Sequence, residues 1–324
     1  MTGLDPTVGT ADNYRRFALR EAAGRSSAYE TLASAVAADV SVLEFLTGLP
    51  AAKRQPNLFF AAARFLLGAT PDPDALHHLI ERRPGDLRRV MLARRTQTNE
   101  VARCATLLPA LRCLRQPLAL IEVGASAGLT LLVDRFSYDY DGHRVEGLDP
   151  AAPTLLCHLE GPVPVPETVP EVVWRRGLDL NPLDPADDAD LHWLECLIWP
   201  GEEGRVERLR AAASTAHRHP VSVERGDLMD RLAELVAAAP RGVTTVVFHS
   251  AVLAYVDTGR RASFARMVRD LGVHWLSNEA PGVLEGATAP AERGGFLLVE
   301  NGATVLAETD PHGTWLCWLS GDAP

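Results

Sequence analysis

Apolar residues recur every three or four positions through the first third of the chain, and this spacing predicts helices. Glycine and proline interrupt the pattern, as at Gly48-Leu49-Pro50 and Pro84-Gly85, and such residues mark helix ends. Alanine is abundant here and β-branched residues are few, which also favours helix. Helical stretches are expected at residues 14–23, 29–38, 42–46, 58–67, 76–94 and 101–114.

The pattern changes near Pro117, where short apolar runs begin to alternate with amphipathic stretches. Runs typical of buried strands lie at 118–123, 172–179, 221–225, 243–249, 273–277, 296–300 and 314–320. Helices are expected between them at 129–136, 190–217, 228–238 and 258–271. Strands that alternate with helices predict a mainly parallel sheet covered on both faces.

We therefore expect an α/β fold with two domains. A Rossmann-like, seven-stranded, mostly parallel sheet with a closing antiparallel pair is expected over residues 117–324, preceded by an all-helical N-terminal domain over residues 1–116. Residues 137–170 interrupt the rhythm with Asp141-Gly142 and a proline-rich stretch. We expect an insertion of turns and short strands there.

Composition narrows the classes of partner. The 324 residues carry 32 Lys and Arg against 42 Asp and Glu, a net charge of −10, which disfavours nucleic acids and anionic membrane surfaces. Five scattered cysteines form no C-x-x-C pair, and His77-His78 is adjacent rather than spaced as ligands, so no disulfide framework and no metal is expected. The first residues lack the apolar core of a signal peptide, and no apolar run is long enough to span a membrane. These features predict a cytoplasmic protein, and its oligomeric state stays open.

The most informative segment is the turn after the first expected strand, Glu122-Val123-Gly124-Ala125-Ser126-Ala127-Gly128. Small residues let the backbone approach a ligand closely, as in loops of the form acid-x-G-x-x-x-G that hold nucleotide-type cofactors. The same segment contains G-x-S-x-G, the nucleophile elbow of serine hydrolases, with Ser126 as the nucleophile. A compact turn without chemistry is the third interpretation.

The position of this turn favours the cofactor. A hydrolase elbow follows several strands and borrows an oxyanion N–H from an earlier loop, whereas no strand is expected before residue 118. A cofactor loop belongs on the first strand of a doubly wound sheet, where the strand order reverses. The hydrolase hypothesis stays open because His274 and His312 follow in the sequence.

A carboxylate at the end of the second expected strand extends the cofactor pattern. Asp179 is placed there to bind both hydroxyls of a ribose, and a turn or helix cap is its competing role. Asp139 and Asp141 lie closer to the usual spacing from Gly124 and are the alternative ribose ligands.

The third expected strand leads into Gly226-Asp227-Leu228. Asp227 is placed to accept the exocyclic amine of adenine, with the backbone N–H of Leu228 beside it. Asp227 is equally suited to cap the helix that follows, so both roles stay open.

Together, Glu122-x-Gly124-x-x-x-Gly128, Gly177-Leu178-Asp179-Leu180-Asn181-Pro182 and Gly226-Asp227 resemble class I S-adenosylmethionine-dependent methyltransferases. The whole chain also resembles an uncharacterised bacterial family, DUF2332, through residues 97–100, 122–128, 177–184, 199–200 and 248–250. Ser126 replaces a glycine that is usual in the methyltransferase loop, and Phe248-His249-Ser250-Ala251 stands where nucleobase methyltransferases have Asn-Pro-Pro-Tyr. The resemblance therefore implies methyl transfer from S-adenosylmethionine to a small molecule.

Carried over position by position, the resemblance implies contacts to each part of the cofactor. It implies that the methionine part is held by Glu122, Gly124, Ala125, Ser126 and Gly128, the ribose by Asp179, and the adenine by Asp227 and Leu228. Leu180 and Gly226, which adjoin these residues, are further cofactor-binding candidates. His249 and Ser250 would line the same site from the fourth strand.

An acceptor with a hydroxyl or ammonium group needs a base. His249 is the first candidate, because an unperturbed histidine titrates near neutrality, and a packed histidine is its competing role. Glu279 and Tyr255 are weaker candidates.

Residues that precede the sheet are candidates for the acceptor pocket. Asn99, Glu100 and Arg103 share a helix, and Trp199 is a further pocket candidate, while a solvated helix face and core packing are the competing roles. A non-catalytic protein that binds a nucleoside cofactor is the remaining alternative function.

Overall fold

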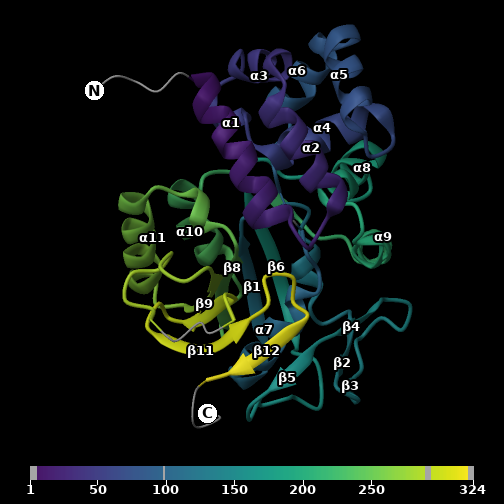
Figure 1. Cartoon of the computed structure of the whole chain (residues 1–324). Coiled ribbons are helices and arrows are strands. Elements are labelled where there is room, and N and C mark those ends of the chain that lie inside the picture. The colour runs from purple at the N-terminus through teal and green to yellow at the C-terminus, as the bar shows by residue number, and fades with distance from the viewer. Residues whose placement is uncertain (1–5, 98, 289–292, 320–324) are drawn as a thin grey trace. The chain divides into compact units, whose positions relative to one another are not determined.

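The computed structural model describes residues 6–97, 99–288 and 293–319 (Figure 1). The chain divides into two compact units, one made of residues 1–98 and 188–207 and the other of residues 99–187 and 208–324. The units thus divide at residue 98, whereas the sequence pattern places a boundary near residue 116. No helix in the described ranges has both the length and the apolar character needed to cross a membrane.

The first unit contains helices and helical turns but no strand among its described residues. Its two short turns are a π-helical turn at Ala18–Ala22 and a 3₁₀ turn at Ala51–Lys53. Its helices are α1 (Pro6–Phe17), α2 (Ser27–Ala38), α3 (Val40–Thr47), α4 (Pro56–Leu67), α5 (Pro73–Arg82), α6 (Pro84–Ala93), α8 (Asp188–Leu197) and the first turn of α9 (Glu203–Arg218). The stretch expected at 76–94 divides at Pro84, because proline suits the first turn of a helix and not its interior.

Aromatic side chains form the core of the helical unit. The ring centroid of Phe60 lies 5.0 Å from that of Tyr29, 5.9 Å from Tyr14 and 6.1 Å from Phe17. All four of these residues are buried. Tilted and edge-on ring pairs of this kind stabilise a core beyond the apolar area that they bury.

The second unit is built on a nine-stranded sheet with the order β5-β12-β11-β10-β9-β8-β1-β6-β7. Five neighbouring strands run parallel: β7 (Val223–Arg225), β6 (Val172–Asp179), β1 (Leu118–Val123), β8 (Thr244–Ser250) and β9 (His274–Glu279). An antiparallel meander follows, made of β10 (Phe296–Glu300), β11 (Thr304–Thr309) and β12 (Trp315–Trp318). The short strand β5 (His158–Glu160) closes this edge of the sheet by parallel pairing with β12.

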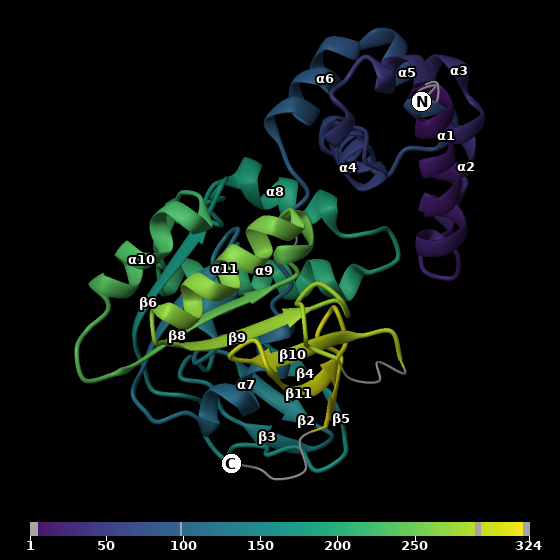
Figure 2. The same cartoon turned by 90° about the vertical axis from the view of Figure 1, so that its left-hand side faces the viewer.

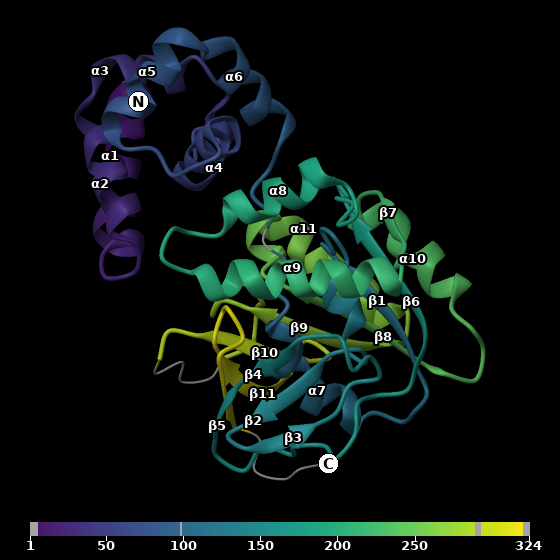
Figure 3. The same cartoon turned by 90° about the vertical axis from the view of Figure 1, so that its right-hand side faces the viewer.

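Helices cover both faces of the parallel part. Figures 2 and 3 view the sheet from opposite sides and show α10 (Leu228–Ala238) and α11 (Thr258–Asp270) over one face and α9 over the other. Helix α7 (Arg103–Cys113) leads directly into β1. All six residues of β1 are buried, as expected for a strand with both faces covered.

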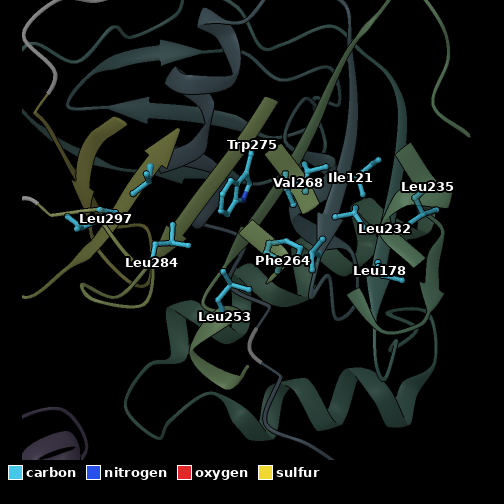
Figure 4. Close-up of a cluster of buried hydrophobic side chains, with 14 residues drawn as sticks. Ile121, Leu178, Leu232, Leu235, Leu253, Phe264, Val268, Trp275, Leu284 and Leu297 are labelled. Carbon is cyan, nitrogen blue, oxygen red and sulfur yellow. The ribbon is translucent and has the colours of Figure 1, made fainter. Parts of the chain in front are cut away.

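The face under α10 and α11 forms a continuous apolar core (Figure 4). Ile121 of β1 packs in one cluster with Leu232 of α10, Phe264 and Val268 of α11, and Trp275 of β9. Side chains alternate along a strand, so Glu122, which follows Ile121, points to the opposite face of the sheet.

Residues 137–156 form a separate three-stranded sheet. Its strands are β2 (Ser137–Tyr140), β3 (His143–Val145) and β4 (Thr154–Leu156), in the order β3-β2-β4. This sheet and β5 occupy much of the connection between β1 and β6.

The α/β fold, the mostly parallel sheet and the antiparallel C-terminal stretch are confirmed, and four details differ. The main sheet has nine strands rather than seven in the described part of the chain, because β11 had not been expected and β5, a short strand within residues 137–170, joins this sheet. The closing pair is therefore a meander of three strands. The helix expected at 129–136 is only a 3₁₀ turn, Leu129–Leu132, and the helix expected at 190–217 is two helices, α8 and α9.

Candidate functional site

The turn after β1 adopts a backbone conformation that depends on its small residues. Gly124, Ser126 and Gly128 all have positive φ, at 71°, 52° and 70°. A Cβ atom on Gly124 would lie 2.4 Å from Val252 Cγ2, and one on Gly128 would lie 2.8 Å from methyl groups of Val221 and Val223. Both glycines are therefore required by their φ angle and by the space around them.

Asp179, at the end of β6, holds this turn in place. Its Oδ2 accepts a 2.8 Å hydrogen bond from the backbone N–H of Ser126, and its Oδ1 accepts one of 2.7 Å from Asn181 N–H. The backbone N–H of Gly124 donates to Leu178 O at 2.7 Å. The sequence placed Asp179 at the tip of the second strand, and the structure brings it directly beside the turn.

The turn lies at the point where the strand order reverses. β1 lies between β6 and β8, so the chain leaves β1 toward one side of the sheet and later returns on the other side. In open α/β sheets, ligands bind in the crevice at the carboxyl ends of the strands at such a point.

Glu122 places a buried carboxyl group next to the turn. Its residue is only 6% exposed, and its Oε1 accepts a hydrogen bond from Thr130 Oγ1. Burial raises the pKa of Glu122 to about 8, and the nearby charge of Asp179 adds to the rise, while the Thr130 hydroxyl and Arg103 oppose it. Oε2 of Glu122 has no hydrogen-bond partner among the described residues.

Two more buried polar atoms near the turn also lack a hydrogen-bond partner among the described residues. Asn99 donates from Nδ2 to Ala125 O at 2.8 Å, while its Oδ1 finds no partner in the described part of the chain. The same is true of Ser126 Oγ, in a residue that is 3% exposed. Buried polar atoms are normally satisfied, so Glu122 Oε2, Asn99 Oδ1 and Ser126 Oγ together mark a polar site at this turn.

Arg103 reaches the carboxyl edge of the sheet from the start of α7. Its Nη1 donates to Ser250 O at 3.2 Å, and its Nε donates to Pro311 O at 2.8 Å. Glu100 accepts from Arg208 Nε at 3.1 Å. Asn99 and Glu100 precede α7, which begins at Arg103, so the three residues do not share a helix as expected. The structure therefore brings Asn99, Arg103 and Ser250 to the same edge as the turn and places Glu100 in an ion pair beside them.

His249 lies in the buried core of the second unit. It has no exposed surface, its Nε2 accepts a 3.0 Å hydrogen bond from Trp275 Nε1, and its Nδ1 lies 2.8 Å from Glu279 Oε1. The indole N–H only donates, so Nε2 is the acceptor and Nδ1 carries the proton toward Glu279. With both ring nitrogens engaged, His249 has the packed role that competed with catalysis.

Glu279 is fixed by the same network. Its Oε1 also accepts from the backbone N–H groups of Val252 and Leu253, at 2.8 and 2.9 Å. Burial opposes ionisation, but the hydrogen bonds from His249 and the backbone prevail and lower the pKa of Glu279. Oε1 therefore has a structural role, whereas Oε2 has no hydrogen-bond partner among the described residues.

Asp227 caps α10. Its Oδ1 accepts from Met229 N–H at 2.8 Å and from Arg260 Nη2 at 2.6 Å, and these bonds keep its pKa below the ordinary value despite partial burial. Gly226 N–H donates to Asp179 O at 2.9 Å. The cap role of Asp227 is therefore observed, and its contact with adenine stays a prediction, as does that of Leu228.

Several other predicted residues occupy different surroundings. Leu180 and Tyr255, at 54% and 74% exposed, follow β6 and β8. Trp199 belongs to the helical unit, where its ring lies 5.3 Å from that of Phe17 and under the guanidinium of Arg25. These contacts give Trp199 the packing role that competed with a pocket wall.

The contacts of Asp139 and Asp141 do not favour a role as ribose ligands, and those of Ser126 do not favour a role as a nucleophile. Asp139 accepts from Gly142 N–H, and Asp141 from His158 and Leu159, all around the separate small sheet and β5. Ser126 Oγ makes no hydrogen bond with any described residue, so neither His274 nor His312 pairs with it. Neither the shorter-spaced ribose ligand nor a hydrolase dyad is assembled in this conformation.

Two residues that hydrogen-bond to predicted site residues, Thr130 and Asn278, were not indicated by any sequence pattern. Thr130 binds Glu122 from a turn that had been expected as a helix. Asn278, fully buried on β9, donates to Ser250 Oγ at 3.2 Å and accepts from Thr309 Oγ1 at 2.7 Å. Spacing along the chain does not reveal such contacts, because the partners lie on strands that are distant in sequence.

The chain matches a family of known proteins over residues 11–318. The family, DUF2332, is described as an uncharacterised protein conserved in bacteria. No curated protein and no solved structure matches the chain. The comparisons therefore indicate no activity, substrate or cofactor for the chain.

Proposed function

Because the chain belongs to the DUF2332 family of bacterial proteins, whose description states no activity, we propose its function from the site itself. In this proposal, the protein is a methyltransferase that uses S-adenosylmethionine and acts on a small-molecule acceptor. One observation carries it: near a turn with positive φ at the strand-order reversal lie three buried acceptor atoms that have no partner among the described residues, next to a strand-end carboxylate.

The residues present fit the amino-acid part of this cofactor. An ammonium group offers three N–H donors and no acceptor, and Glu122 Oε2, Asn99 Oδ1 and Ser126 Oγ are all able to accept. Asp179 fixes the turn and stands at the strand end where a ribose is expected. Exposed Leu180 follows Asp179 and offers an apolar surface for the adenine ring.

The chain's own part in the reaction is binding and orientation. When bound, S-adenosylmethionine supplies a methyl group on a positively charged sulfur, which is already a strong electrophile. The protein has to align the acceptor with that methyl group and keep water away. His249 is occupied on both nitrogens, so the proposal places no proton transfer on it, and Tyr255 stays the predicted base that solvent reaches.

A non-catalytic nucleoside-binding protein is the second candidate function. The observation that favours it is the engagement of both ring nitrogens of His249 in the core, which removes the first of the expected catalytic groups. Cofactor binding is common to both candidates, and only transfer of a labelled methyl group to an acceptor separates them.

Titration calorimetry of the full chain with S-adenosylmethionine and S-adenosylhomocysteine tests the proposal. We expect saturable binding that is weakened by Gly177→Ala, because the new Cβ would lie 2.7 Å from Ala125 Cβ in the turn. Gly85→Ala is the matched control, since a Cβ there meets no atom within 4 Å. Absence of binding of both ligands, in protein with a cooperative unfolding transition, would refute the proposal.

A further inference from the structure

The carboxyl group of Glu122 is the only acid among the three acceptor atoms without partners at the turn. It sits on β1 on the face opposite the apolar core, and the elements packed around it supply few charges. Arg103 and Cys104 face it from α7, the Thr130 hydroxyl from the 3₁₀ turn, and Asp179 from β6. The side chain of its neighbour on β8, Phe248, carries no charge.

These neighbours stabilise the negative charge of an ionised Glu122 only weakly. The strongest stabilising contact is a hydroxyl group, the adjacent carboxylate of Asp179 repels a second negative charge, and the guanidinium of Arg103 is engaged by Ser250 O and Pro311 O. A buried carboxylate without adequate partners takes up a proton instead of remaining charged.

We propose that Glu122 is a proton-linked receptor for an ammonium group: it is neutral in the unliganded protein and releases its proton when the ammonium group of the ligand binds at the turn. The inference rests on the proposed function, because the α-amino group of S-adenosylmethionine is the ammonium group in question. It goes further by assigning the charge state of Glu122 before and after binding.

The proton balance is simple. The O–H bond of the Glu122 carboxyl breaks, the proton passes to the buffer, and the ligand keeps all of its own protons. The new ion pair is completed by hydrogen bonds to Ser126 Oγ and Asn99 Oδ1, which buried charges require. The raised pKa of Glu122, about 8, agrees with a neutral group at pH 7.

The sign of the pH dependence follows. Binding removes a proton, so affinity increases with pH as long as unliganded Glu122 is protonated and the ligand amine keeps its charge. Both conditions hold between about pH 5.5 and 7.0, since α-amino groups titrate near 8. Over that window one linked proton changes the dissociation constant by about tenfold per pH unit.

The test is calorimetry of the full chain across this window, in buffers of different ionisation enthalpy that count released protons. The probes are S-adenosylhomocysteine and 5′-methylthioadenosine, which keeps the nucleoside and lacks the amino-acid part. We expect the first ligand to release about one proton and to bind about tenfold more tightly per pH unit, and the second to show neither effect.

Two variants identify the group. Glu122→Gln keeps the shape of the side chain and should abolish both the proton release and the slope. Thr130→Val removes the hydroxyl that stabilises the carboxylate, so it should weaken binding at about pH 7 while keeping the slope.

The outcomes separate this inference from the proposed function. If both nucleosides bind and S-adenosylhomocysteine releases no proton, or if Glu122→Gln keeps the slope, the receptor role of Glu122 is wrong and the cofactor proposal stands. If neither S-adenosylhomocysteine nor 5′-methylthioadenosine binds to folded protein, both are wrong.

Discussion

The backbone N–H of Ser126 donates a 2.8 Å hydrogen bond to the carboxylate of Asp179, 53 positions further along the chain. The same carboxylate accepts from Asn181 N–H, so one side chain fixes the turn after β1 and the segment after β6. The predicted ribose ligand, Asp179, is therefore also the residue that holds the turn in its conformation.

Asp179→Ala should weaken binding of S-adenosylhomocysteine by about ten- to a hundred-fold. The loss removes charge-assisted hydrogen bonds, which contribute about 1.5–3 kcal/mol each, and it releases the turn. Calorimetry at neutral pH measures the change. Asp141→Ala is the comparison variant, because Asp141 is an alternative ribose ligand and lies beside the small sheet.

The two variants also decide between the carboxylates. Equal affinity of Asp179→Ala and the parent protein would contradict the placement of the ribose at β6. A loss of affinity in Asp141→Ala alone would return the ribose to the connection between β1 and β6.

The sequence was sufficient to locate the turn and its carboxylate. Glu122 lies one residue before the end of the buried strand β1 and Asp179 ends β6, and the carboxyl ends of parallel strands meet at one edge. The alternation of strands and helices likewise predicted the parallel sheet. The sequence pattern did not predict β11, and it did not predict that β5 joins the main sheet. Strands in a meander or inside an irregular connection have little periodic pattern.

The roles of individual polar side chains depended on long-range contacts that no local pattern encodes. His249 is polar and ends a strand, which makes it look available for catalysis, but Trp275 of the neighbouring strand occupies its second nitrogen. Arg103 looked like a helix-face residue, and its partner Pro311 lies 208 positions away. Such pairings follow from strand order and not from spacing.

His249→Ala should lower the free energy of unfolding by roughly 3–5 kcal/mol, because it leaves the buried Glu279 carboxylate without its ring partner. Chemical denaturation at neutral pH measures this loss, with the exposed His143→Ala as control. Affinity for S-adenosylhomocysteine in the folded fraction should be preserved. Unchanged stability together with lost methyl transfer would show that His249 is catalytic after all.

Glu122→Gln should make the protein more stable than the parent at about pH 8. The pKa of Glu122 is raised from 4.5 to about 8 in the folded state, so its stabilising effect is complete below pH 4.5 and is lost as the pH rises through about 8. The difference should be on the order of a few kcal/mol at the alkaline end and should shrink on acidification. Denaturation curves measured across this range check the sign, and a gap that widens toward low pH would contradict it.

Ser126 should not react with a fluorophosphonate probe. Its hydroxyl is buried and has no histidine partner among the described residues, so nothing activates it as a nucleophile. Intact-mass measurement after incubation with the probe gives the answer, and Ser126→Ala is the control for labelling elsewhere. Stoichiometric labelling that Ser126→Ala abolishes would favour the serine hydrolase.

A crystal structure of the protein with S-adenosylhomocysteine would show where the cofactor binds. We expect the amino-acid part of the ligand at the turn of residues 124–128, with its ammonium group near Glu122 and its ribose hydroxyls at Asp179. Ligand bound away from this turn, or a turn that remains without ligand at concentrations that saturate the protein in solution, would show that the turn is not the cofactor site.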